Sequence, residues 1–76
     1  MEDKINPQHY QRNGMECIDA IKAAVQNLSG AEAFETGSAI KYLWRWKEKG
    51  DKDDLNKAIW YIRDMIADIE EQEFQE

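Results

Sequence analysis

A short basic run contains the residues best suited to bind a small anion. Lys41, Arg45 and Lys49 recur every four residues, so on a helix they form one basic stripe. Tyr42 and Trp44 lie beside that stripe. An arginine holds phosphate oxygens through paired N–H donors, and an aromatic ring stacks on a planar base. The pattern therefore predicts a site for a ligand that carries a phosphate and a base, with a solvated basic face as the alternative.

A second candidate pair lies near the N-terminus, where His9 and Tyr10 are adjacent. Histidine titrates near neutral pH, and it can donate a hydrogen bond to a phosphate or act as an acid–base group. We predict that both residues contribute to the same ligand site. The alternative is an N-terminal arm that is held in place by its aromatic side chain.

Carboxylates with metal-binding spacing are present but incomplete. Glu16 and Asp19 lie three residues apart, as do Glu32 and Glu35, and each pair is half of the pattern that holds a cation between neighbouring helices. We find no second pair on the last predicted helix, and helix capping explains these acids more simply. A further group of acids that could hold magnesium is Asp51, Asp53 and Asp54.

The motifs of common nucleotide enzymes are missing from the sequence. Neither a phosphate-binding GxxxxGK[ST] loop nor a GxGxxG turn occurs, and we see no pairing of a nucleophile with a base. The single cysteine, Cys17, falls on an apolar helix face and is expected in the core. The sequence therefore predicts no metal site, no cofactor and no identifiable catalytic residue, and it favours binding over catalysis.

The elements that position these residues are expected to be helices. A first helix is predicted over residues 15–28 and is followed by the Ser29-Gly30 stop signal. A short helical turn over 31–35 should end at a break over 36–38, after which a second helix runs to Gly50. Gly50 is expected to be the left-handed residue that follows the last helical turn.

A third helix is predicted from about Lys52 to Gln72. Its apolar residues follow one another at alternating steps of four and three, which is typical of a helix that packs against another helix. These residues are Leu55, Ile59, Ile62, Ile66 and Ile69. Trp60 and Tyr61 lie off this stripe and indicate a second buried surface.

Together these elements predict one all-α domain that assembles with itself. We expect a compact bundle of about three helices over residues 15–76 with a frayed acidic tail, preceded by an irregular arm over 1–14. A chain of 76 residues has a thin core, and one cysteine excludes an internal disulfide. The second helix is apolar on several faces and includes Trp46, so we predict a homo-oligomer with the ligand site between subunits.

Net charge and hydropathy limit the classes of molecule expected as partners. The formal net charge is −6, and acids dominate after Asp64, which argues against DNA or RNA as a partner. We see no apolar run long enough to span a bilayer and no secretory signal, so no membrane partner is expected. A free cysteine fits a reducing compartment, and the sequence therefore predicts a cytoplasmic protein.

Several runs also resemble a known family. They are PQHY at 7–10, ECIDAI at 16–21, AIKYLWRWK at 39–47 and the Trp60-Tyr61 pair. Over about residues 5–66 the chain resembles small tailed-phage proteins of unknown function. These are often labelled nucleotide kinases, since a similar domain occurs in a nucleotide kinase of short-tailed coliphages.

The resemblance implies a phage protein that acts in the cytoplasm of an infected bacterium and has a nucleotide ligand. Our leading expectation is that it sequesters a phosphate-containing nucleotide, with a host defence signal as one candidate. The alternatives are a nucleoside monophosphate kinase and a protein–protein interaction module.

Overall fold

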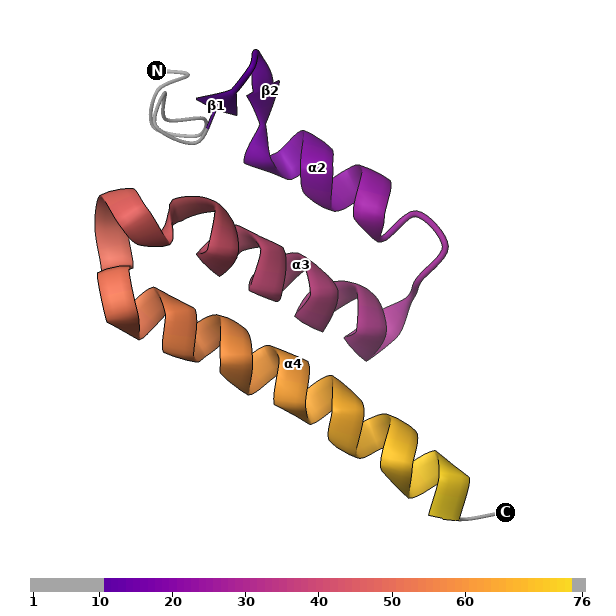
Figure 1. The fold of residues 1–76 in the computed structure, drawn as a ribbon. Helices are drawn as coiled ribbons and strands as arrows, with labels where there is room; N and C mark the ends of the chain where they lie inside the picture. The colour runs from indigo at the N-terminus through magenta and orange to yellow at the C-terminus, as the bar shows by residue number, and fades with distance from the viewer. Residues whose placement is uncertain (1–10, 75–76) are drawn as a thin grey trace.

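The computed structural model describes residues 11–74, so the predicted site residues His9 and Tyr10 lie outside the described part. Its elements, in chain order, are β1 (Gln11–Arg12), β2 (Met15–Glu16), α2 (Cys17–Ala24), α3 (Gly30–Arg45), the π-helical turn η2 (Trp46–Gly50) and α4 (Asp51–Phe74) (Figure 1). The predicted helical class is confirmed.

A short β-hairpin, whose two strands have two residues each, precedes the first helix. β1 and β2 pair antiparallel, with Arg12 opposite Met15, and Asn13 and Gly14 form the connecting turn with φ values of 54° and 76°. A two-residue hairpin turn of this kind needs positive φ at both central residues. The pair Asn-Gly is favoured there because both residues tolerate positive φ. Residues 11–14 of the expected irregular arm therefore belong to a regular hairpin, which they form with residues 15 and 16.

α2 begins directly after β2. The backbone N–H of Glu16 donates to Asp19 Oδ2 at 3.3 Å, which is one half of a capping box at the helix start. This pair of acids therefore has a local structural role, as the capping explanation predicted.

α3 is continuous where the sequence analysis expected a break. Residues 36–38 lie inside the helix, and Gly37 is buried against α2. A Cβ atom at position 37 would lie 3.0 Å from Ile21 Cγ2. The glycine thus permits close approach of α2 and α3, and the predicted stop at 36–38 is wrong because this packing outweighs the low helix propensity of glycine.

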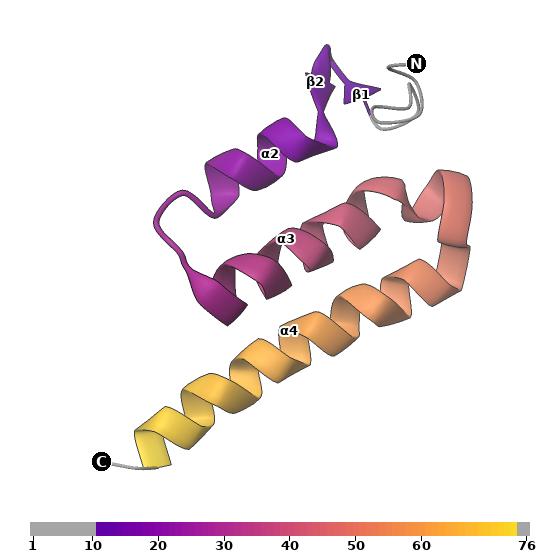
Figure 2. The same cartoon turned by 180° about the vertical axis from the view of Figure 1, so that it is seen from behind.

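The helices form a layer and do not close into a bundle. The two long helices α3 and α4 make an antiparallel hairpin, and the shorter α2 lies on the opposite side of α3 (Figures 1 and 2). The principal extents are 49 × 28 × 20 Å. Within the described residues, the fully buried apolar side chains are those of Cys17, Ala39 and Ala58. Among these helices, none has the length and apolar character needed to cross a lipid bilayer.

The corner between α3 and α4 also differs from the prediction. Gly50 lies inside η2, and the positive φ of 52° belongs to Asp51. Gly50 is therefore not the left-handed residue that the sequence analysis expected. Its missing side chain serves another contact, because a Cβ atom there would lie 2.0 Å from Asp54 Cγ. The buried carboxylate of Asp54 occupies that space and accepts a hydrogen bond from the backbone of Gly50.

We predict that Gly50→Ala lowers the free energy of unfolding by about 1–3 kcal/mol, the usual cost of forcing extra atoms into a packed site. Urea denaturation followed by circular dichroism measures this change, with Lys49→Ala in the same turn as the control. Replacing a glycine in an unstrained, open position by alanine ordinarily stabilises a protein. A more stable Gly50→Ala variant would therefore contradict the close packing of Asp54.

Candidate functional site

Three cationic groups converge on one aromatic ring. Lys41 Nζ lies 4.9 Å, Arg45 Cζ 5.1 Å and Lys57 Nζ 5.4 Å from the centre of the Tyr42 ring. Each cation is attracted by the face of the ring, whereas the cations repel one another. An anion bound between them would relieve that repulsion. Such an arrangement is typical of a site for a small anionic ligand.

Further aromatic side chains extend this surface. Tyr42 stacks on Tyr61 with ring centres 6.1 Å apart, and Trp60 meets Tyr61 edge-on at 5.1 Å. Trp60 is 60% exposed, so much of its side chain is open to a ligand. An open groove of about 340 Å³ is lined by Tyr42, Lys57, Trp60 and Tyr61. We refer to Lys41, Tyr42, Arg45, Lys57, Trp60 and Tyr61 together as the Tyr42 cluster.

The antiparallel hairpin assembles the Tyr42 cluster from two helices. Lys41, Tyr42 and Arg45 lie in the last turns of α3, where a spacing of four residues returns to the same side of a helix. Lys57, Trp60 and Tyr61 occupy α4 at spacings of three and four. The corner η2 reverses the chain, and the two triplets consequently face one another across the helix pair.

Arg45 also has a buried partner. Its Nε donates to Asp54 Oδ2 at 2.8 Å and its Nη2 to Asp54 Oδ1 at 3.3 Å. The side chains of Arg45 and Asp54 are only 16% and 1% exposed. The hydrogen bond and charge of the guanidinium hold the pKa of Asp54 below its ordinary value, despite burial. Two donors of Arg45 are thus engaged by Asp54. Of the two lysines, Lys57 lines the groove, whereas Lys41 approaches the Tyr42 ring from outside its lining.

Trp44 lies away from the Tyr42 cluster. Its ring faces the Arg12 guanidinium at 5.3 Å, and its backbone carbonyl accepts a hydrogen bond from Arg12. Arg12 also forms an ion pair with Glu48 at 3.3 Å. Trp44 therefore fastens the N-terminal hairpin to the end of α3.

Of the other predicted ligand residues, the structure places Lys49 on the exposed side of η2. Lys41 and Arg45 both lie against the Tyr42 ring, whereas no contact with that ring involves Trp44 or Lys49 among the described residues. Of these predicted ligand residues, only Tyr42 lines the groove itself. Lys57, Trp60 and Tyr61 complete the Tyr42 cluster but were not among the predicted site residues. Their only sequence signal was the position of Trp60 and Tyr61 off the apolar stripe, because their proximity to Tyr42 depends on how α4 folds back.

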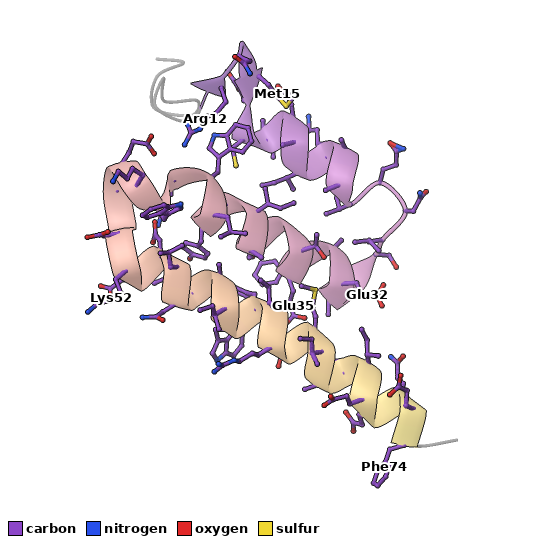
Figure 3. All side chains as sticks on the ribbon, in the orientation of Figure 1. Arg12, Met15, Glu32, Glu35, Lys52 and Phe74 are labelled. Atoms are coloured by element: carbon purple, nitrogen blue, oxygen red, sulfur yellow. The ribbon has the colours of Figure 1, made fainter. Side chains whose placement is uncertain are left out.

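A cluster of acids lies on the same helix pair. Oxygens of Glu35, Asp64 and Asp68 all fall within 4.8 Å of one another, and Glu35 extends from α3 between the two long helices (Figure 3). Asp64 and Asp68 are the second pair that the sequence analysis did not find on the last helix, and they were missed because their spacing of four faces a single glutamate on α3. Three carboxylates suit a hard divalent cation such as Mg²⁺.

The neighbouring acids raise the affinity of Glu35 for a proton. A side-chain hydrogen bond with Asp64 raises the pKa of Glu35 to about 7, aided by burial and by the negative charges of Asp64 and Asp68. Protonated Glu35 donates to the Asp64 carboxylate and relieves the repulsion between the acids. A cation held by these three residues would displace that proton.

The comparisons with known proteins place the chain in a family without a known activity. The family model described as protein of unknown function, DUF3310, matches residues 4–63. The chain belongs to the DUF3310 family. Within the described residues, the match runs from the hairpin to Arg63 in α4 and so includes the whole Tyr42 cluster, but it stops before Asp64 and Asp68. No curated protein and no solved structure matches this DUF3310 chain.

The DUF3310 match agrees with the predicted resemblance to a family of unknown function over most of the chain. The phage origin, the nucleotide ligand and the kinase label stay predictions.

We predict that Glu35 makes the stability of the protein pH-dependent. The pKa of Glu35 is raised from 4.5 to about 7 by folding. The folded state therefore holds the proton more tightly than the unfolded state. The resulting stability is fully present below about pH 4.5 and is lost as the pH rises through about 7.

Urea denaturation at a series of pH values between about 4 and 8 tests this expectation. Glu35→Gln, which cannot lose a proton, should flatten the decline in unfolding free energy over that range, whereas Glu70→Gln on the exposed end of α4 should leave it unchanged. An identical decline in wild type and Glu35→Gln would show that another group is responsible.

Proposed function

We propose that this DUF3310 protein binds a nucleotide at the Tyr42 cluster. Lys41 and Lys57 would contact the phosphate, and the exposed Trp60 would stack on the base. The observation that carries the proposal is the convergence of three cations on the Tyr42 ring. Asp54 pairs with Arg45 and its charge also acts on Lys57, so one buried carboxylate faces three cations and the cluster keeps a local excess of positive charge.

The charge of the whole chain supports a small ligand. The formal net charge is −6, so a long nucleic acid that extends beyond the Tyr42 cluster would meet a predominantly acidic surface. The groove of about 340 Å³ lies at the lower end of the roughly 300–1,000 Å³ range of small-molecule sites. A single nucleotide fits both constraints.

The aromatic part of the cluster supports a ligand with a planar ring. Trp60 is exposed beside the tyrosine pair, and stacking of a base on such a side chain contributes about 1–3 kcal/mol. An inorganic phosphate would use the lysines without the rings. A nucleotide uses both, and for that reason we favour it over a simple anion.

We further propose that the protein retains its nucleotide unchanged. The cluster combines cations and rings, and within it no side chain is paired as a nucleophile with a base. Sequestration of a phage- or host-derived nucleotide, including a host defence signal, needs only affinity. The residues that carry this proposal come from α3 and α4 of one chain, so the proposed site needs no residue from a neighbouring subunit.

One observation favours a nucleoside monophosphate kinase as the second candidate. Glu35 precedes Tyr42 by seven residues on α3, and Asp64 follows Lys57 by seven on α4. The acid cluster therefore lies about 10 Å along the helices from the Tyr42 cluster. Magnesium held there could approach the phosphates of a bound nucleotide, as phosphoryl transfer requires. The third candidate, an interaction module, would use the same exposed aromatic side chains to bind a protein.

We predict that Lys57→Ala weakens nucleotide affinity by about tenfold or more, since a hydrogen bond to a charged group contributes about 1.5–3 kcal/mol. Trp60→Ala should weaken it by a similar factor. Isothermal titration calorimetry with mono-, di- and cyclic nucleotides measures both effects. The control is Lys52→Ala, which removes the same charge from an exposed position at the start of α4.

Two results would contradict the binding proposal. One is the absence of heat for every nucleotide with the wild-type protein. The other is an equal loss in Lys52→Ala and Lys57→Ala, which would reflect the net charge alone.

Incubation with ATP, magnesium and each deoxynucleoside monophosphate separates retention from turnover. Retention predicts that chromatography recovers the nucleotides unchanged. Formation of a diphosphate that is lost in both Lys57→Ala and Asp64→Asn would instead establish the kinase, with the acid cluster as its metal site.

A further inference from the structure

We infer that α4 binds α4 of a second copy of this chain, in antiparallel orientation, through an exposed apolar stripe. The stripe consists of Ile59, Ile62, Ile66 and Ile69, and we call it the isoleucine seam. These residues are 43%, 39%, 48% and 54% exposed, respectively. The inference does not depend on the proposed ligand.

The isoleucine seam is not the face that α4 turns toward α3. Asp54 and Ala58 are buried, Tyr61 stacks on Tyr42, and the Thr36 hydroxyl lies 3.4 Å from Met65 Sδ. The α3-facing residues 54, 58, 61 and 65 follow steps of four and three. Leu55 and the seam residues Ile59, Ile62 and Ile66 each follow one position later, about 100° around the helix. α4 thus carries two stripes with the spacing of helix packing, and only one of them is covered.

The solvent-accessible surface area of the chain supports the presence of a partner. The accessible surface of the chain is 5990 Å², whereas a folded monomer of 8.9 kDa is expected to expose about 4,800 Å². The excess of roughly 1,200 Å² is larger than the approximately 800 Å² that each partner buries in a standard interface. One interface of ordinary size would therefore remove about two thirds of this excess.

The spacing of the seam identifies the partner as a helix. Alternating steps of four and three keep a stripe in contact with a second helix over its whole length. From Leu55, which continues the stripe toward the corner, to Ile69 the seam spans about 21 Å. A second α4 offers the same length and spacing, and a twofold axis makes such a stripe complementary to itself.

The charge distribution along α4 favours an antiparallel orientation of the two helices. Residues 51–63 of α4 carry equal numbers of acids and bases, whereas residues 64–74 carry five acids and no base. A parallel pair would place the two acidic halves side by side. An antiparallel pair places each acidic half beside a neutral half that contains Lys52, Lys57 and Arg63, which lowers the repulsion.

The seam and the Tyr42 cluster lie on opposite sides of the α3 contact. Counting about 100° per residue, the side chains of Lys57 and Trp60 project on the side of the α3-facing stripe that is remote from Ile62. Pairing through the seam therefore leaves the groove accessible. Assembly and ligand binding can be tested separately.

The first test is sedimentation equilibrium of the full chain at micromolar concentration. We expect a mass of twice 8.9 kDa. The double variant Ile62→Glu/Ile66→Glu should be monomeric, with a dissociation constant raised at least about a hundredfold. Ala67→Glu adds a charge to the exposed side of the same helix off the seam and should remain dimeric.

Circular dichroism of the double variant checks that it stays helical, and its nucleotide affinity should equal that of the wild type. A monomeric wild-type protein, or a dimer that the double variant does not weaken, would overturn the inference. Either result leaves the calorimetry of the Tyr42 cluster unaffected.

The second test is disulfide formation in a mixture of Ile59→Cys and Ile69→Cys proteins, both carrying Cys17→Ala. Antiparallel pairing predicts mixed disulfides between the two proteins. Disulfides formed only between identical chains would indicate a parallel pair and contradict the orientation.

Discussion

The ion pair between Arg45 and Asp54 is the interaction on which the arrangement of α3 and α4 depends. Asp54 is 1% exposed, and a buried carboxylate without a partner costs several kcal/mol. The guanidinium supplies that partner through two hydrogen bonds, and Gly50 leaves room for the carboxylate. This contact determines where α4 begins relative to the end of α3. The pairing of Lys57 with Tyr42 and of Asp64 with Glu35 follows from it.

The same contact links the corner to the candidate site. Arg45 lies over the Tyr42 ring while it binds Asp54, so one of the three cations at that ring is fixed in place by the corner. A ligand would therefore meet a surface whose rings and charges are already in place, which lowers the entropy cost of binding. The strongly bent corner and the Tyr42 cluster are therefore coupled through Arg45.

Sequence alone predicts the local features of this fold because they depend on neighbouring residues. The cap at Glu16 and the helical class follow from such local chemistry. The π-helical corner and the continuous α3 could not be predicted, since Asp54 and Ile21 decide them from other elements. The acid cluster and the position of Lys57 beside Tyr42 could not be predicted for the same reason, because both depend on residues from two helices.

The proposed interface between two copies of α4 illustrates this limit in another way. The apolar second helix suggested self-association, whereas the structure leaves the most regular apolar stripe exposed on α4. The stripe itself was evident from the spacing of its isoleucines. The spacing did not show which of the two heptad-spaced stripes of α4 faces α3. The buried Asp54 and Ala58 determine that face through their contacts with another helix.

Nitrogen-15 NMR during a nucleotide titration tests the central claim most directly, because each of the three tryptophans gives its own indole N–H signal. Trp60 lines the groove, whereas Trp44 packs against Arg12. The account predicts that the Trp60 indole signal and the Tyr42, Lys57 and Tyr61 amide signals shift with one saturable affinity. The Trp44 indole signal should stay in place. A saturable shift centred on Trp44, or no shift at Trp60, would contradict a nucleotide site at the Tyr42 cluster.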